Sequence, residues 1–130
     1  MEVPIPSRIL IVDDHQIVRQ GIRRILETQD DWEVCGEAGN GEEALYLNDT
    51  LKPDAIIMDI TMPVMNGLEA TREITSAHPE SKVLIFTMHE PQNLASIQRS
   101  GAKGILTKSR ASHDLTPALQ TILAGQTYFD

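Results

Sequence analysis

Five short apolar runs alternate with five amphipathic stretches along the chain. The runs cover residues 8–12, 34–38, 55–59, 82–87 and 104–108. Most of them are apolar without alternation, which is typical of strands buried on both faces of a parallel sheet. The run at 34–38 contains Glu37, which indicates a strand at the edge of the sheet.

The stretches between the runs carry apolar residues at helical spacing. In the first, positions 17–18, 21–22 and 25–26 form the apolar side, opposite Arg19 and Arg23. Asn40 predicts the N-cap of a helix that runs to residue 51, and the third helix runs from residue 68 to about 78, before Pro79. Five strand–helix units of this kind predict an α/β fold in which a parallel sheet has helices on both faces.

The last two helices have weaker signals. The fourth, from about residue 92 to 100, ends at Gly101 and has few apolar residues, so we expect it to be the least firmly held element. The last has apolar residues at 115, 118, 119 and 122. Within it, Pro117 predicts either a start near Thr116 or a distorted first turn.

Length and composition narrow the class of protein. The 130 residues fit one domain, and 41% hydrophobic and 23% charged residues are ordinary for a globular chain. With 19 acidic and 11 basic residues, the net charge of −8 argues against direct binding of DNA or an anionic membrane by this chain. The single cysteine, Cys35, excludes a disulfide framework and a cysteine-based zinc site. Without a signal sequence or a run of membrane-spanning length, we expect a cytoplasmic protein.

Polar residues gather where the predicted strands end. They are Asp13 and Asp14 after the first strand, Asp59 after the third, Thr87 after the fourth and Lys108 after the fifth. Because ligands bind outside the carboxyl ends of strands in such sheets, these side chains should meet in one crevice.

The residue types point to phosphoryl chemistry. Converging carboxylates repel one another, and a hard divalent cation such as Mg²⁺ would resolve this repulsion. The Asp59 carboxylate is a competent nucleophile toward phosphorus, and Lys108 and the Thr87 hydroxyl could bind phosphoryl oxygens. A helix-start role for Asp13 and Asp14 is the plain alternative, which the joint placement with Asp59 disfavours.

With these residues the sequence resembles the receiver domains of two-component response regulators, from about residue 8 to 124. The resemblance rests on Asp13-Asp14-His15, Asp59, the loop 62–67, Thr87, Gly101-Ala102 and Lys108. Further similarity, at 13–21, 86–89, 108–109 and 124–129, is to the subgroup with a C-terminal helix-turn-helix output domain.

The resemblance implies a flavodoxin-like, doubly wound sheet of five strands in the order 2-1-3-4-5. It implies that a sensor histidine kinase phosphorylates Asp59, with Mg²⁺ on Asp14, Asp59 and the backbone carbonyl of Thr61. Asp13 would act on the metal mainly through water. Thr87 would move toward the phosphoryl group, and an aromatic side chain three residues before Lys108 would turn inward.

Two positions depart from the family pattern. Ile105 stands where the aromatic residue is usual, and Ser109 stands where many receivers have proline. Ile105, together with an output domain that we expect to be missing, motivates the alternative function, a phosphorylation-independent interaction module. An enzymatic magnesium-dependent phosphotransferase is disfavoured, because Thr61 stands where such enzymes commonly place a second acid. We expect a regulatory phosphoacceptor with no enzymatic turnover beyond self-phosphorylation and slow autodephosphorylation.

Phosphorylation is expected to order residues 87–90 and repack the helix at 92–100. The contact face would then be that helix, the fifth strand and the last helix, with a homodimer as one outcome. We expect an N-terminal extension at 1–7, the receiver domain at 8–125, and the start of a linker to an absent DNA-binding domain at 126–130.

Overall fold

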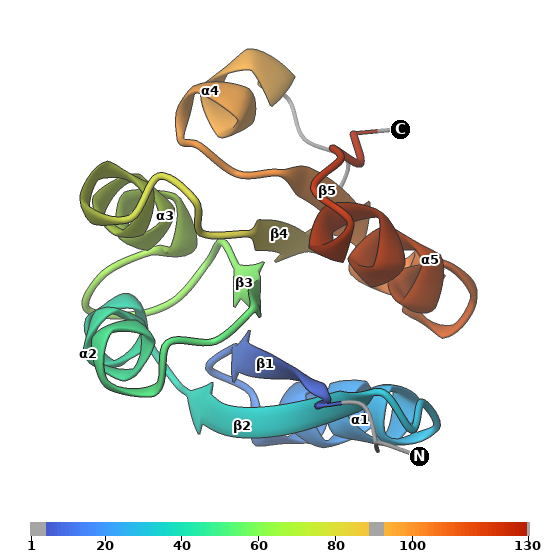
Figure 1. Ribbon diagram of the computed structural model, residues 1–130. Helices are drawn as coiled ribbons and strands as arrows, with labels where there is room; N and C mark the ends of the chain where they lie inside the picture. Colours follow the sequence, from blue (N-terminus) through green and yellow to red (C-terminus); the bar gives the residue numbers. More distant parts are fainter. Residues whose placement is uncertain (1–4, 89–92, 130) are drawn as a thin grey trace.

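The computed structural model describes residues 5–88 and 93–129 (Figure 1). Five parallel strands form one sheet in the order β2-β1-β3-β4-β5, as predicted. The strands are β1 (Ser7–Val12), β2 (Trp32–Ala38), β3 (Ala55–Asp59), β4 (Val83–Thr87) and β5 (Gly104–Thr107). The helices are α1 (Gln16–Glu27), α2 (Gly41–Leu51), α3 (Gly67–Ala77), α4 (Leu94–Arg99) and α5 (Ala111–Leu123), with a 3₁₀ turn at Lys108–Arg110.

The sheet separates two hydrophobic cores. Successive strand residues point to opposite faces, so Ile9 and Ile11 of β1 enter one core while Leu10 and Val12 enter the other. The first, which we call the α1–α5 core, includes the buried residues Ile22 and Leu26 of α1 and Leu115, Ala118, Leu119 and Ile122 of α5. The second, the α2–α3 core, includes Ala44, Ala70, Ile74, Ile97 and Ile105. Figure 1 shows α1 and α5 on one face and α2 and α3 on the other.

The helix caps follow the sequence signals. The side chains of Asn40, Asn66 and Asn93 accept hydrogen bonds from the backbone N–H three residues later, at the starts of α2, α3 and α4. Gly101 follows α4 with φ +94°, the left-handed conformation expected of a residue that ends a helix. Of the residues in α4, only Ile97 is buried, which agrees with a loosely anchored helix.

Two predictions about the helices are wrong. Ile17 is 81% exposed, because it lies about 100° around α1 from Val18, outside the strip that faces the sheet. Neither expectation for Pro117 holds: α5 begins at Ala111, so Pro117 is in the helix interior rather than in its first turn. A proline there removes one helical hydrogen bond, but Pro117 is exposed and its neighbours Leu115 and Ala118 are fully buried. The fourth helix begins at Leu94, and residue 92 lies outside the described residues.

None of the helices in the described part of the chain combines the length and apolar character that crossing a bilayer requires.

Candidate functional site

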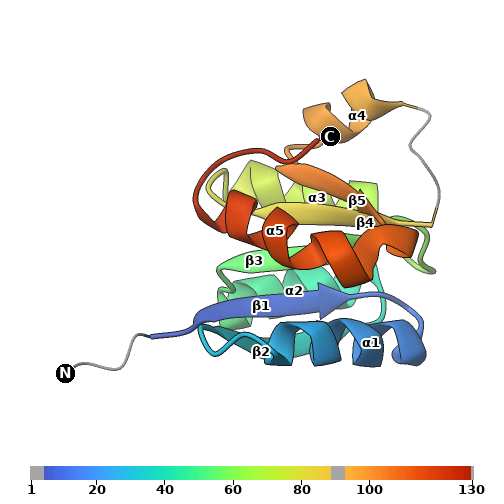
Figure 2. The same cartoon turned by 90° about the vertical axis from the view of Figure 1, so that its right-hand side faces the viewer.

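The predicted site residues meet at the edge of the sheet where the strands end, to which the β1 arrow points in Figure 2. The connections from β1 and β3 leave toward opposite faces, with α1 on one side and α3 on the other. This is the switch point of the sheet, where a crevice opens between neighbouring strands. A cavity of about 490 Å³ lies here, lined by Asp14, His15, Val18, Asp59, Thr61, Thr87, Met88 and Lys108.

Asp13 is the most deeply buried acid of the site, with no exposed surface. Its Oδ1 accepts the backbone N–H of His15 at 2.9 Å, which fixes the carboxylate at the start of α1. Its Oδ2 lies 2.8 Å from Nζ of Lys108. Asp13 therefore contributes a buried negative charge that one ammonium group compensates.

Asp59 ends β3 and is 4% exposed. Its Oδ1 lies 3.2 Å from Nζ of Lys108. Burial and the nearby Asp13 charge together raise the pKa of Asp59, although the Lys108 ammonium opposes this shift. The negative charge of the Asp59 carboxylate is therefore only partly compensated by Lys108, and a further positive charge in the pocket would be favourable.

Lys108 joins the two buried acids. Burial lowers the pKa of its ammonium, but contact with Asp13 and the charge of Asp59 outweigh burial, and the pKa lies above its ordinary value. Its Nζ also lies 5.8 Å from the centre of the Phe86 ring, within the range of a cation–π contact. Lys108 is therefore a fixed cation at the end of β5.

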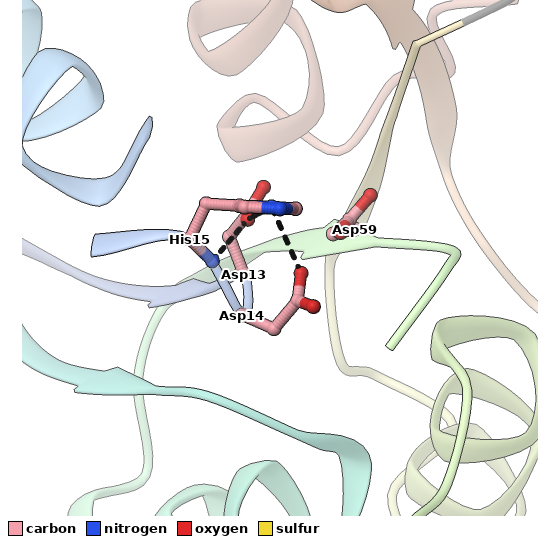
Figure 3. A group of neighbouring side chains, drawn as sticks. All are labelled: Asp13, Asp14, His15 and Asp59. Atoms are coloured by element: carbon pink, nitrogen blue, oxygen red, sulfur yellow. Dashed lines mark hydrogen bonds and ion pairs between the residues drawn. The ribbon is translucent and has the colours of Figure 1, made fainter. Parts of the chain in front are cut away.

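Asp14 and His15 form the open side of the pocket. Figure 3 shows the His15 ring beside the two aspartates that follow β1, with Asp59 approaching from β3. The Nδ1 atom of His15 lies 3.1 Å from Oδ1 of Asp14 and 3.3 Å from Oδ1 of Asp13. The His15 side chain is 68% exposed, so it stands at the entrance.

Thr61 and Thr87 line the same cavity, from the loop after β3 and from the end of β4. Thr61 is exposed and Thr87 is half-buried. His89, in the range 86–89 that resembles the helix-turn-helix subgroup, lies outside the described residues. The structure thus brings together all six residues that the sequence predicts for the site.

The loop after β3 passes very close to Asp59. A Cβ atom on Gly67 would overlap the Asp59 carbonyl oxygen, and the Gly67 N–H donates to the carbonyl of Ile60 at 2.8 Å. In the same loop Val64 has φ +69°, an unfavourable conformation for a β-branched residue. Glycine is therefore needed at position 67, where the loop approaches the Asp59 backbone closely. The positive φ of Val64 introduces backbone strain into the same loop.

Sequence reasoning missed a charged network beside the site. Arg19 and Arg23, expected on the outer side of α1, both bind Glu37 of β2, with nitrogen–oxygen distances of 2.9 and 2.6 Å. Arg19 also donates to the backbone carbonyl of Asp13. Hydrogen bonding to Arg23 lowers the pKa of Glu37, against the effect of burial, and Arg19 adds to the lowering. The sequence did contain a signal for this network. Arg19 and Arg23 are one helical turn apart, and Glu37 is an acidic residue within a strand with which both could pair.

The donor set fits a divalent cation such as Mg²⁺. One ligand atom from each of Asp13, Asp14, His15 and Asp59 lies within 4.8 Å of the other three. Opposite ligands of an octahedral Mg²⁺ are about 4.2 Å apart, and the ion prefers carboxylate oxygens. The buried Oδ2 of Asp13 is paired with Nζ of Lys108 at 2.8 Å, and a carboxylate oxygen has a second lone pair that can accept a further interaction.

The comparisons with known proteins identify the family of this chain. Residues 9–120 match the response regulator receiver domain family. The response regulator GacA of Pseudomonas viridiflava is 41% identical over 122 residues, which are 93% of this chain and 57% of GacA. UvrY of Escherichia coli is 40% identical over 121 residues, 92% of this chain and 56% of UvrY. The chain thus spans little more than half the length of these curated relatives.

Solved structures show the same fold. A two-component response regulator of the LuxR family from an Aurantimonas species has a TM-score of 0.90 and 40% identity, over 95% of this chain and 89% of that one. The isolated receiver domain of RcsB from Salmonella enterica, solved with the phosphomimetic BeF₃⁻, has a TM-score of 0.86 and 27% identity. That alignment covers 96% of this chain and 94% of the RcsB domain.

Proposed function

Since the chain belongs to the response regulator receiver domain family, we propose that it takes a phosphoryl group on Asp59 from a sensor histidine kinase. The observation that carries this proposal is the buried Asp59 carboxylate, 3.2 Å from Lys108 and within an acidic cluster that could hold a metal. Receiver domains are regulatory, and a regulatory phosphoacceptor is the role that we propose for this chain.

In the proposed transfer, an Asp59 carboxylate oxygen attacks the phosphorus of a phosphohistidine. A new oxygen–phosphorus bond forms, the nitrogen–phosphorus bond breaks, and the imidazole nitrogen leaves with the electron pair. Lys108 holds its positive charge beside the acceptor, where it would pair with a phosphoryl oxygen. The Thr87 hydroxyl would donate a hydrogen bond to another oxygen.

Asp13, Asp14, Asp59 and the backbone carbonyl of Thr61 would hold Mg²⁺, with Asp13 acting mainly through water. When bound, the ion supplies positive charge that offsets the negative charge of the phosphoryl oxygens. The raised pKa of Asp59 supports a cation here, because an added positive charge would favour the ionised carboxylate that must act as nucleophile.

The response would pass from Thr87 to the surface formed by α4, β5 and α5, which we call the α4-β5-α5 face. The few buried residues of α4 make this the part of the fold that a modest energy change can rearrange. This face would then bind a partner, with a homodimer as the expected complex. Because Ile105 has no aromatic ring, this response would not include the inward turn of an aromatic side chain at that position.

We propose that the receiver unit is 8–125, after an extension at 1–7, and that 126–130 begins the connection to a DNA-binding output domain. The relatives GacA and UvrY are response regulators nearly twice the length of the matched region. The function of the longer protein would be phosphorylation-dependent control of transcription.

Incubation with Mg²⁺ and acetyl phosphate tests the proposal. Intact-mass measurement should show one added phosphoryl group, lost with Asp59→Ala or when EDTA replaces Mg²⁺. Asp49→Ala is the control, because the Asp49 side chain is 79% exposed and belongs to α2, outside the residues that line the cavity with Asp59 and Lys108. No added mass under conditions that label another receiver domain would overturn the proposal.

Ile105 also favours the second candidate, a module that binds its partner without phosphorylation. In that case dimerisation of wild type and Asp59→Ala would be the same, with and without acetyl phosphate, even if wild type is labelled.

A further inference from the structure

The outer edge of β5 is occupied by the chain's own residues 127–129, which we call the terminal segment. Tyr128 pairs with Gly104 in a parallel bridge. The Tyr128 N–H donates to the Lys103 carbonyl, and the Ile105 N–H donates to the Tyr128 carbonyl, both at 2.8 Å. Figure 1 shows the end of the chain beside β5, between α4 and α5. The terminal segment thus satisfies backbone groups that an edge strand would otherwise expose.

The side chains of the terminal segment join both hydrophobic cores. Tyr128 packs against the α1–α5 core, and Phe129 packs against the α2–α3 core. The α2–α3 core includes Ile97 of α4 and Ile105 of β5. The segment therefore straddles the edge of the sheet, and Phe129 packs against the core to which Ile97 of α4 and Ile105 of β5 belong.

Gly104 shapes the docking place. A Cβ atom at this position would lie 2.6 Å from the Tyr128 carbonyl oxygen, closer than real contacts allow. The residue is buried and lies opposite the bridge. Only glycine lets the terminal segment approach β5 this closely, so the strand edge and the segment are matched to each other.

We infer that the edge of β5 is a strand-docking site for residues 127–129, and that the docked segment competes with a second copy for the α4-β5-α5 face. The competition rests on the proposed function, because that function assigns the dimer to this face. Docking and dimerisation then exclude each other, so weaker docking strengthens dimerisation by the same factor for each of the two copies that must release its segment. The segment would restrain association until the receiver is phosphorylated.

β5 gives a physical route for this control. The strand has four residues, with the docking contacts at its start and Lys108 directly after its end. Lys108 pairs with Asp59, the proposed acceptor. A change in what Lys108 binds therefore acts on the same short strand that holds the terminal segment.

Amide hydrogen exchange of Ile105, measured by NMR on the full chain, tests docking by itself. Its N–H donates to Tyr128, so its exchange should be slow in wild type and at least about tenfold faster in Tyr128→Pro, which lacks the N–H that donates to Lys103. Phe129→Ala should give a smaller acceleration in the same direction. Gln126→Ala, with an exposed side chain, is the control and should leave the exchange unchanged. Unprotected Ile105 in wild type would overturn the inference.

Sedimentation equilibrium with Mg²⁺ but without beryllofluoride tests the competition, because the segment is inferred to restrain the unphosphorylated receiver. Tyr128→Pro should dimerise about a hundredfold more tightly than wild type, about tenfold for each copy, and Gln126→Ala should match wild type. Equal or weaker dimerisation of Tyr128→Pro, with Ile105 exchange accelerated, would refute competition and leave docking alone. Labelling with acetyl phosphate checks the proposed function separately. If wild type is labelled but Tyr128→Pro does not dimerise more tightly, only the inferred competition is refuted.

Discussion

Asp59→Asn should stabilise the protein when no metal is present. The substitution keeps the size of the side chain and removes its negative charge. In the folded protein Asp59 is almost completely buried beside Asp13, and both effects raise the pKa of its carboxyl. A carboxylate whose pKa is raised on folding opposes folding when it is ionised, so its neutral replacement should be favourable.

The magnitude follows from the charges around Asp59. Carboxylate atoms of Asp13 and Asp14 lie within 4.8 Å, and each would repel Asp59 by about 3.5 kcal/mol at an effective dielectric constant of about 20. The Lys108 ammonium at 3.2 Å would attract it by about 5 kcal/mol on the same basis. Asp14 is partly exposed, which weakens its repulsion. The sum of the two repulsions, the attraction to Lys108 and the cost of burying a charge favours Asn at position 59 by about 1–2 kcal/mol.

Urea denaturation in EDTA at pH 7 measures this difference. With a slope of about 1.5 kcal/mol per molar urea, the midpoint of Asp59→Asn should lie about 1 M above that of wild type. Mg²⁺ should stabilise wild type more than the variant, because the variant lacks one carboxylate ligand. Asp49→Asn, at an exposed aspartate, is the control and should not change the midpoint.

The pH dependence gives a second check. The advantage of Asp59→Asn should vanish below the pKa of an unfolded aspartate, about 3.9, and grow as pH rises through the raised pKa of folded Asp59. If Asp59→Asn were no more stable than wild type at pH 7 in EDTA, the account of uncompensated charge at this site would be refuted.

Three further substitutions test other parts of the structure by urea denaturation. Glu37→Gln should lower the free energy of unfolding by about 1–2 kcal/mol, because it weakens the bonds to Arg19 and Arg23. Since the pKa of Glu37 is lowered on folding, this loss should be full above the pKa of an unfolded glutamate and disappear as pH falls through the folded pKa; a loss independent of pH would contradict the assignment. Val64→Gly should raise the free energy of unfolding by about 1 kcal/mol by relieving the positive φ, and any destabilisation would count against strain there. Gly67→Ala should lower it by at least about 2 kcal/mol and impair labelling of Asp59, because its Cβ would meet the Asp59 carbonyl; a variant as stable as wild type would disprove the need for glycine.

The sequence was sufficient for the sheet and for most of the site. Doubly buried strands are legible as continuous apolar runs, and Glu37 correctly placed β2 at the edge. Because parallel strands end at one edge, residues far apart in the chain, such as Asp13 and Lys108, could be expected together. Their roles in phosphoryl transfer remain predictions.

What the sequence did not reveal depends on tertiary contacts. Ile17 belongs to the apolar pattern, but its exposure is decided by how α1 is rotated on the sheet. The early start of α5 overrides Pro117, because burial of Leu115 and its neighbours outweighs one missing hydrogen bond. The place of Tyr128 beside Gly104 has no local signal, since a single bridge involves no repeating pattern.

The division of the hydrophobic interior by the sheet has a consequence for how this protein can change over evolution. Ile97 of α4 belongs to the α2–α3 core, while the α1–α5 core contains no residue of α4 among those described. Substitutions in the two layers should therefore have nearly additive effects on stability. Substitutions in one core could therefore alter a mobile surface of the protein while the packing of the other core is kept. The two faces of the sheet could evolve independently.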